Sequence, residues 1–474
     1  MLTKPVQSMT AFDAIPQNVD FDADLIRRYD KAGPRYTSYP TAVQFHEGFT
    51  AEDYRSQARA SNASGRPLSL YVHIPFCDTV CYYCACNKIV TKDRSRARPY
   101  LDRLLREMEM QAALFDAGRP VDQLHLGGGT PTFIAHDEMA ELMTGIAGHF
   151  GGLNEETGEY GIEIDPREVS ADTLSLLRRL GFNRLSLGVQ DFDPRVQKAV
   201  NRIQPAEQTL AVLNEARRVG FRSISVDLIY GLPLQTLQSF AATVNRIIDA
   251  APDRVSVFNY AHLPERFKPQ RRINVEDLPS PAERLGILQQ TIAQLTEAGY
   301  VYIGMDHFAR PDDELAVAQR EGTLYRNFQG YSTHADCDVI GLGVSSIGMV
   351  QDCYAQNRHD QDSYYARIDA GDLAVFRGVL LDADDRLRRD VINALICHFR
   401  LDFASVEARH GVAFADYFAE EMKMLGPMQA DGLITVDADG IAVTPRGRLL
   451  IRNICMVFDR YIREAQVVRH SRVI

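Results

Sequence analysis

The sequence predicts an α/β fold: a partial (β/α)6 barrel with an N-terminal arm and a mostly helical C-terminal domain. Short apolar runs typical of strands recur roughly every thirty residues. The segments between them, such as Pro99–Phe115, Asp137–His149 and Pro205–Val219, have apolar residues at helical spacing. This alternation indicates parallel strands with right-handed crossovers, in fewer units than the eight of a closed barrel. The predicted strands lie near Leu68–Ile74, Gln123–Leu126, Tyr160–Ile164, Arg184–Leu187, Ser223–Leu228 and Arg254–Phe258.

The chain divides into three predicted parts, which are the arm (1–60), the barrel domain (61–375) and the C-terminal domain (376–474). In the C-terminal domain, residues 432–444 have the pattern of a hairpin with a turn at Asp439-Gly440, and a helix is expected to follow. Helices with a hairpin resemble a winged-helix module. The acidic Asp437 and Asp439 at the hairpin tip argue against DNA binding, so a packing or lid role is expected.

Composition and charge exclude several classes of function. The chain has 52 basic and 63 acidic side chains, a net charge of −11, which disfavours nucleic acid and anionic membranes as partners. It contains no run of 18 apolar residues that would span a bilayer. Free thiols without a visible export signal predict a reducing, cytoplasmic location. Four scattered cysteines are expected to be small buried hydrophobic residues without a role, namely Cys337, Cys353, Cys397 and Cys455.

Four more cysteines lie within ten residues, and the first three have the spacing C-x3-C-x2-C. Three thiolates from Cys77, Cys81 and Cys84 on one short loop favour an iron–sulfur cluster with one iron left open to bind a small molecule. A structural zinc site would need a fourth ligand at matching spacing, and Cys86 follows Cys84 too closely for the usual paired arrangement. A disulfide framework is not expected in a chain of this length.

Polar or glycine residues follow each of the six predicted strands. In chain order the strand ends are the cysteine loop, Gly127-Gly128-Gly129-Thr130-Pro131, Glu163-Ile164-Asp165, Gly188-Val189-Gln190, Tyr230-Gly231-Leu232-Pro233 and Asn259-Tyr260-Ala261-His262. Because parallel barrels place their chemistry at the C-terminal ends of the strands, these groups are expected to form one ring of ligand contacts.

Individual members of this ring allow more than one interpretation. The glycine run is either an ordinary turn or a place where backbone approaches a ligand. Glu163 and Asp227 are either surface carboxylates or, because each lies in an apolar run, partners of ribose hydroxyls or of a cation. Gln190 and Arg202 are candidates for polar contacts with the same ligand. The basic stretch 266–272 is either a solvated surface or a segment that attracts a polyanionic substrate.

Several longer motifs resemble those of the oxygen-independent coproporphyrinogen III oxidases, a family of radical S-adenosylmethionine (SAM) enzymes. The resemblance extends from Pro34-Arg-Tyr-Thr-Ser-Tyr-Pro-Thr41 to Ser471-Arg-Val-Ile474 and covers nearly the whole chain. The matching motifs are Tyr71-Val-His-Ile-Pro-Phe-Cys77, Cys81-Tyr-Tyr-Cys84-Ala-Cys86-Asn-Lys-Ile-Val-Thr91, Gly127-Gly-Gly-Thr-Pro131, Glu163-Ile-Asp-Pro-Arg-Glu168, Gly188-Val-Gln-Asp-Phe192 and Asn259-Tyr-Ala-His-Leu-Pro264. Tyr83 and Leu126 depart from the family, which has phenylalanine and tryptophan there, and neither change is expected to remove chemistry.

The resemblance implies a radical-SAM barrel with a [4Fe–4S] cluster ligated by Cys77, Cys81 and Cys84. It also implies two SAM molecules per chain. Contacts of the first would be Tyr71, Gly128, Glu163, Ala261 and Ile347, and contacts of the second Tyr83, Gly129, Thr130, Gln190, Arg202 and Asp227. Cys86, Tyr71 and Glu163 are expected to act in catalysis, Cys86 without ligating the cluster.

The reaction implied is the conversion of two propionates of coproporphyrinogen III to vinyl groups, which gives protoporphyrinogen IX in haem biosynthesis. The expected partners are this substrate and a low-potential electron donor such as a flavodoxin or ferredoxin, and the chain is expected to be a monomer. The arm holding Arg35 and Tyr39 would close over the porphyrinogen. Candidate cations for the propionates are Arg35, Arg266, Arg271, Arg272 and Arg310.

Two other functions remain open from the sequence. The first is a haem chaperone on the same scaffold, whose members typically lack the cysteine matching Cys86 and have a His-Asn-x-x-Tyr-Trp stretch. This chain has Cys86 and no tryptophan, which favours the enzyme. The second is a ferredoxin-like electron carrier, which a fourth cluster ligand would favour but which would leave the glycine and carboxylate ring without a use.

Overall fold

The computed structural model describes residues 19–154 and 156–464, and a twelve-stranded sheet forms its centre. Six neighbouring strands of this sheet pair in parallel and in chain order, as the sequence predicted. They are β1 (Leu68–Ile74), β4 (Val121–Gly128), β5 (Glu159–Ile164), β6 (Arg184–Gln190), β7 (Ser223–Tyr230) and β8 (Arg254–Asn259). The predicted partial barrel of six strand–helix units is therefore confirmed.

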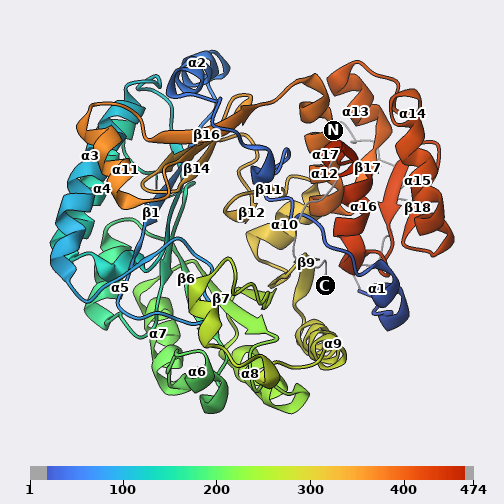
Figure 1. Ribbon diagram of the computed structural model, residues 1–474, viewed down its shortest axis with the longest axis horizontal. Coiled ribbons are helices and arrows are strands. Elements are labelled where there is room, and N and C mark those ends of the chain that lie inside the picture. Colours follow the sequence, from blue (N-terminus) through green and yellow to red (C-terminus); the bar gives the residue numbers. More distant parts are fainter. Residues whose placement is uncertain (1–18, 155, 465–474) are drawn as a thin grey trace, which may run out of the picture.

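Helices cover the outer face of this curved sheet (Figure 1). They are α3 (Ala97–Ala112), α4 (His136–Phe150), α5 (Ala171–Arg179), α6 (Pro194–Ala199), α7 (Ala206–Val219), α8 (Leu237–Ala250) and α9 (Pro281–Glu297). Local sequence sets their ends: Ser170 and Thr236 cap α5 and α8 through reciprocal hydrogen bonds, and α7 ends at Gly220, whose φ of 91° suits glycine. Their apolar faces pack on the sheet and make one continuous core.

The sheet continues beyond the six predicted units on both sides. β13 (Asp338–Leu342) pairs in parallel with β1 and is followed by antiparallel β14 (Ile347–Val350), β15 (Cys353–Asn357) and β16 (Val375–Leu380). At the other edge, β10 (His307–Ala309) and β9 (Val301–Gly304) are antiparallel. Peripheral elements are β2 (Phe76–Cys77), β3 (Ile89–Val90), β11 (Tyr325–Asn327), β12 (Gly330–Ser332), α10 (Glu314–Glu321) and α11 (Gln361–Asp369).

The C-terminal domain is mostly helical and lies beside the barrel, with which it shares one continuous core (Figure 1). Its helices are α12 (Ala383–His398), α13 (Phe403–His410), α14 (Phe414–Tyr417), α15 (Ala419–Ala430), α16 (Ile451–Val457) and α17 (Arg460–Glu464). The predicted hairpin is present as β18 (Ile434–Val436) and β19 (Gly440–Val443), and β17 (Arg400–Asp402) extends it to three strands. Phe414, Phe418 and Phe458 are fully buried at its centre.

The N-terminal arm contains α1 (Ala23–Tyr29) and α2 (Ala51–Ser61), and α1 packs on the C-terminal domain. The Tyr29 hydroxyl donates to Asp431, with 2.7 Å between the oxygens, and the Tyr36 hydroxyl donates to buried Asp459 at 3.0 Å. Residues 1–18 of the predicted arm and 465–474 of the predicted C-terminal domain lie outside the described residues. Within residues 19–154 and 156–464, no helix combines the length and apolar character needed to cross a bilayer.

Candidate active site

A cavity of about 270 Å³ lies at the C-terminal ends of β4 to β7, beneath the cysteine loop. Most of the predicted site residues line it together. From the predicted sets these are Cys77, Cys81, Tyr83, Cys84, Cys86, Gly128, Gly129, Thr130, Glu163, Gln190, Arg202 and Asp227. The expectation that the polar strand ends form one ring is therefore confirmed for β4 to β6 and the cysteine loop, whereas Tyr230 at the end of β7 lines a different cavity and Asp227 lies within that strand.

The cysteine loop is held in place by backbone contacts to two other segments. The Tyr82 N–H donates to the Val200 carbonyl at 2.9 Å, and the Asn201 side-chain amide donates to the Val80 carbonyl at 2.8 Å. The loop then turns on itself, because the Cys84 N–H donates to the Cys81 carbonyl. These contacts hold the thiols of Cys77, Cys81 and Cys84 against one cavity.

The thiols differ in their surroundings. Burial raises the pKa of Cys77 to about 12, although the Thr130 hydroxyl, 3.7 Å from its sulfur, opposes that effect. A hydrogen bond from the Cys86 thiol lowers the pKa of Cys84 and raises that of Cys86. Cys81 is 8% exposed, whereas Cys86 lies at the surface. A metal ion is the natural partner of a thiol such as Cys77, because coordination removes the proton that burial retains.

Two arginines that share one carboxylate lie beside the Cys81 sulfur. Arg202 Nη1 is 3.6 Å from this sulfur and 2.9 Å from Asp165 Oδ2, and Arg167 Nη2 is 3.8 Å from the sulfur. Arg167 also forms a two-pronged pair with Asp165. No role was predicted for Asp165 or Arg167 from the sequence, although their position shortly after Glu163 at a strand end was a usable signal.

The glycine run is shaped mainly by contact with the protein's own backbone. A Cβ at Gly129 would lie 2.6 Å from the Phe76 carbonyl oxygen, and Gly128 has a φ of 116°. The Gly128 N–H donates to Glu163 at 3.2 Å, and the Gly129 and Thr130 N–H groups donate to the Ile74 and Phe76 carbonyls. These three N–H groups are thus engaged within the protein.

The two carboxylates of the cavity differ in their pKa values. Burial raises the pKa of Glu163, but hydrogen bonds from His125, 3.2 Å away, and from the Gly128 N–H outweigh it and leave the pKa below its usual value. Burial raises the pKa of Asp227 to about 6, and the neighbouring charge of Glu163 adds to the rise while the Ser186 and Ser256 hydroxyls oppose it. Both carboxylates are therefore ionised at neutral pH.

Buried polar atoms without a hydrogen-bond partner among the described residues line the cavity, and Gln190 Oε1 and Arg202 Nε are two of them. Gln190 follows a bulge in β6 with a φ of 69°, and its Oε1 has no partner among the described residues. The same holds for Nε of Arg202, a residue that is only 6% exposed. Because buried polar atoms are normally satisfied, these two atoms indicate a ligand with polar groups.

Three predicted site residues do not line this cavity. Tyr71 lies deeper, where its hydroxyl is 3.1 Å from His73 Nδ1 and its ring stacks on His125. Ile347 lies in β14, and Ala261 lines a different cavity. Ala261 is nevertheless tied to the cysteine loop, because the buried Gln270 amide donates to the carbonyls of both Ala261 and Tyr83, at 3.2 and 3.0 Å.

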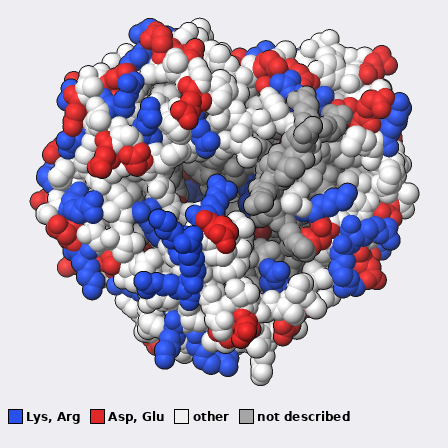
Figure 2. All heavy atoms as spheres, viewed as in Figure 1, with Lys and Arg blue, Asp and Glu red and all other residues white. Residues whose placement is uncertain are grey.

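The arginines predicted to bind propionates are dispersed. Arg310 follows β10 at the N-terminal end of β8, where its N–H donates to the Asp253 carbonyl, so it lies at the opposite end of the barrel from the cysteines. That prediction is wrong for Arg310. Arg266, Arg271 and Arg272 lie on the exposed segment after β8, and Arg35 pairs with Asp306. Figure 2 shows a hollow near the centre of the face seen in Figure 1, with basic side chains gathered along its side.

Comparison with known proteins identifies the family. A model of the radical SAM superfamily matches residues 71–247, and one of the HemN C-terminal domain matches residues 381–450. The oxygen-independent coproporphyrinogen III oxidase of Pseudomonas aeruginosa is 58% identical over 456 residues, which cover 96% of this chain and 99% of the relative. This chain belongs to the oxygen-independent coproporphyrinogen III oxidase family. The Escherichia coli oxidase is 56% identical over 459 residues, which cover 97% of this chain and 99% of that one.

The solved structure of coproporphyrinogen III oxidase (HemN) from Escherichia coli has the same fold. It superposes with a TM-score of 0.89 at 54% identity, and the match covers 94% of this chain and 100% of that one. The relatives named here are oxidases, which favours the oxidase over the haem-chaperone alternative. As a radical SAM protein, the chain uses a [4Fe–4S] cluster and SAM. The cavity fits both groups, because it combines four free thiols, three of them at the C-x3-C-x2-C spacing, with two arginines at one sulfur and with unpartnered buried polar atoms.

Proposed function

We propose that this protein oxidatively decarboxylates two propionate side chains of coproporphyrinogen III under anaerobic conditions, which gives protoporphyrinogen IX. The observation that supports this most strongly is the cysteine-lined cavity at the strand ends, in a chain 58% identical over 96% of its length to a named oxidase. The reactive radical of such a reaction has to be kept from bulk water, which a cavity lined by the cluster ligands favours over a flat surface.

In this proposal Cys77, Cys81 and Cys84 hold the cluster, and Cys86 beside them does not. When bound, the reduced cluster would give one electron to SAM and break its C5′–S bond, which would supply a 5′-deoxyadenosyl radical to take a hydrogen atom from the propionate β-carbon. Loss of CO₂ with transfer of one electron to an external one-electron acceptor would then leave the vinyl group. Arg167 and Arg202 place positive charge at the Cys81 sulfur, which stabilises the anionic cluster environment.

Two SAM molecules per chain are proposed, with each set of contacts as the family resemblance assigns them. For the first, ionised Glu163 offers a carboxylate to an ammonium group, and the resemblance assigns Gly128, Tyr71, Ala261 and Ile347 as the further contacts. For the second, Gln190, Arg202 and Asp227 offer one acceptor, one cation and one carboxylate in the same cavity, and Gly129, Thr130 and Tyr83 complete the set. The unpartnered atoms of Gln190 and Arg202 support this second set.

We further propose a cytoplasmic monomer that receives electrons from a low-potential donor such as a flavodoxin or ferredoxin. Residues 85–87 of the cysteine loop are exposed, so a donor can approach the cluster from that side. The net charge of −11 supports the proposal that neither nucleic acid nor a membrane is a partner.

The test is anaerobic turnover with reconstituted protein, SAM, a reductant and coproporphyrinogen III. Protoporphyrinogen IX, CO₂, methionine and 5′-deoxyadenosine should accumulate, and deuterium at the propionate β-carbon should appear in the 5′-deoxyadenosine. If a cluster-replete sample cleaves SAM but leaves the propionates intact, the oxidase proposal fails and the haem chaperone takes its place, which a haem titration would then check.

A further inference from the structure

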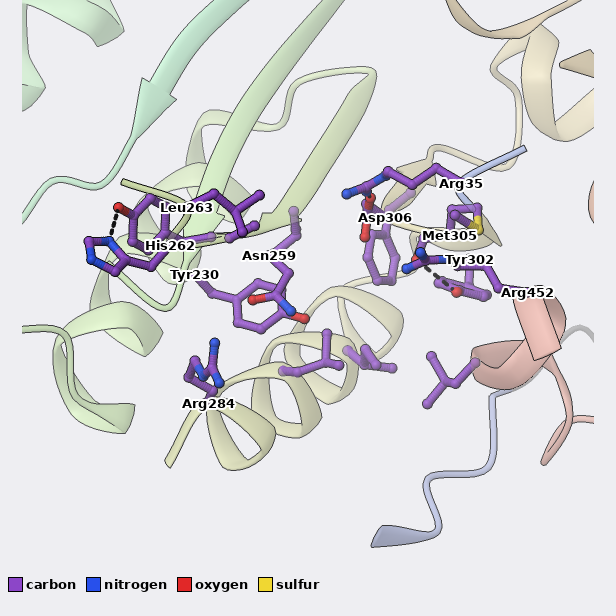
Figure 3. Close-up of a pocket in the computed structure, with 17 residues that line it drawn as sticks. Arg35, Tyr230, Asn259, His262, Leu263, Arg284, Tyr302, Met305, Asp306 and Arg452 are labelled. Carbon is purple, nitrogen blue, oxygen red and sulfur yellow. Dashed lines mark hydrogen bonds and ion pairs between the residues drawn. The ribbon is translucent and has the colours of Figure 1, made fainter. Parts of the chain in front are cut away.

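A second cavity, of about 260 Å³, opens where the arm, the barrel edge and the C-terminal domain meet (Figure 3). Its lining shares no residue with the cysteine cavity. The walls come from the ends of β7 and β8, from α9, from the turn between β9 and β10, and from the segment around α16. Ala261 lies on its rim, and the Gln270 amide connects that rim to the backbone of Tyr83 in the cysteine loop.

The charge of this lining is unusual in an acidic protein. Arg35, Arg284 and Arg452 line the cavity with only one carboxylate, Asp306, which pairs with Arg35. No carboxylate pairs with Arg284 within the part of the chain that the structure describes. Burial lowers the pKa values of Arg35 and Arg452 only to about 10, so both remain cationic at neutral pH. The lining therefore has a net positive charge.

The arginines occupy two ends of the cavity. In Figure 3, Arg284 rises from α9 toward Tyr230 and Asn259, whereas Arg35 and Arg452 enter from the opposite side. The Oδ1 atom of Asn259 is buried without a hydrogen-bond partner among the described residues. Gly231, with a φ of 85°, makes room for this arrangement, because a Cβ there would lie 3.0 Å from Arg284 Cδ.

Between the cationic ends the wall is largely apolar. The apolar residues are Val257, Leu263, Leu288, Ile292, Met305, Phe308 and Leu449. A ligand that matches both features has an apolar body with separated carboxylates. The volume lies below the ~300–1,000 Å³ of pockets that enclose whole ligands of drug size, so this cavity accepts part of a large ligand and not all of it.

We propose that this cavity binds the carboxylate-bearing edge of the tetrapyrrole substrate, with Arg284 at one end and Arg35 and Arg452 at the other. The proposal rests on the proposed function and adds the place where the substrate is held. It replaces Arg310 with Arg284 and Arg452 in the set of propionate-binding cations. Arg284 is a specificity residue, because its charge selects a ligand with ionised carboxylates.

The test compares Arg284→Gln with Arg284→Lys and with the control Arg310→Gln, an exposed arginine at the other end of the barrel. The binding probe is coproporphyrin III, the stable oxidised tetracarboxylate, measured by fluorescence titration against its tetramethyl ester. Arg284→Gln should weaken binding of the acid about tenfold and leave the ester unchanged. The affinity of Arg284→Lys for the acid should lie within about threefold of that of the unchanged protein. Arg310→Gln should bind the acid as tightly as the unchanged protein does. Iron content and melting temperature report whether each variant is folded.

In turnover, Arg284→Gln should raise KM for coproporphyrinogen III about tenfold with kcat little changed. Equal binding of the acid by Arg284→Gln and the unchanged protein would overturn the inference, and so would equal binding of acid and ester by the unchanged protein. If the acid binds through Arg284 but no propionate is lost in turnover, the proposed reaction fails while the carboxylate site stands.

Discussion

Cys84 and Cys86 share a hydrogen bond although only Ala85 separates them along the chain. Two thiols so close in sequence cannot easily reach separate irons of one cube, and the hydrogen bond favours Cys84 as the thiolate of the pair. Cys86 remains a protonated thiol at the exposed side of the loop. It is thus available for a role in turnover that leaves the cluster intact.

We therefore expect Cys86→Ser to keep its iron and its cluster absorption while product formation falls at least a hundredfold. Serine retains a hydrogen-bond donor for the Cys84 sulfur but not the reactivity of a thiol. The matched control is Cys84→Ser, which should lose the cluster. Iron analysis and visible spectroscopy separate the two outcomes, and loss of iron from Cys86→Ser would make Cys86 a fourth ligand and revive the ferredoxin alternative.

Asp227 offers a pH-dependent test of the second SAM site. Its pKa is raised by burial to about 6, so its charge is lost as the pH falls through about 6. The pKa of Glu163 lies below its usual value, and Glu163 stays ionised over the same range. SAM stoichiometry from equilibrium dialysis should therefore fall from two toward one between pH 7.5 and 5.

Asp227→Asn should bind close to one SAM at every pH in that range, while the iron content stays that of the unchanged protein. A stoichiometry of two in this variant at pH 7.5 would remove Asp227 from the site. A decline with pH that persists in the variant would assign the titration to another group.

At the scale of elements, the glycine loop after β4 and the cysteine loop after β1 are packed directly on each other. The Gly129 and Thr130 N–H groups donate to carbonyls of Ile74 and Phe76, each at 2.8 Å. A side chain at Gly129 would collide with backbone atoms of Pro75 and Phe76, which cannot rotate away as a side chain would. The glycine therefore sets the distance between two loops that both line the cavity.

Gly129→Ala should lower the free energy of unfolding by about 1–3 kcal/mol and reduce cluster retention, because the cysteine loop is displaced. Gly148→Ala is the control: a Cβ at Gly148 in α4 would meet no atom of another described residue within 4 Å, and alanine should stabilise the helix by about 0.5–1 kcal/mol. Chemical denaturation and iron content measure both effects. An unchanged stability and iron content in Gly129→Ala would show that the two loops move apart without cost.

The sequence predicted those elements whose signal is local. Six parallel strands were identified because each is a short buried run that follows a helical segment. The pairing of β13 with β1 joins residues 338–342 to residues 68–72, and no local pattern indicates it. β13 and β14, residues 338–342 and 347–350, were not among the predicted strands. Strands β9 and β10 are four and three residues long, too short for a clear periodicity.

In the candidate site, too, the residues with a local sequence signal were predicted and those that depend on long-range contacts were not. Twelve residues that the cysteine spacing, the polar strand ends or the family resemblance had singled out line one cavity. The contact of Arg167 with the Cys81 sulfur depends on the approach of β5 to the cysteine loop, which the sequence does not indicate. Arg310 was selected for its charge alone, and its position at the other end of the barrel follows from the antiparallel course of β10.

At the scale of the whole molecule, the arm connects the C-terminal domain to the barrel edge. Buried Arg452 of α16 donates to the Pro34 carbonyl at 2.9 Å, and the Asn453 amide donates to the Tyr29 carbonyl at 2.8 Å. One residue beyond Pro34, Arg35 pairs with Asp306 at the barrel edge. The position of the arm over the second cavity therefore depends on its attachment to the C-terminal domain.

Tyr36→Phe should weaken that attachment. The Tyr36 hydroxyl donates to Asp459, which is 2% exposed and whose pKa is raised by burial, so its loss leaves a buried carboxylate with one partner fewer. The free energy of unfolding should fall by about 1–3 kcal/mol, and trypsin should cut the arm several times faster at Arg27, Arg28 and Arg35.

Tyr417→Phe is the matched control, because Tyr417 is 41% exposed and donates to Asp384 at 2.6 Å. It should cost less than about 1 kcal/mol and leave cleavage of the arm unchanged. Equal cleavage rates in the two variants would show that the arm is held by its other contacts and not by the buried Tyr36–Asp459 bond.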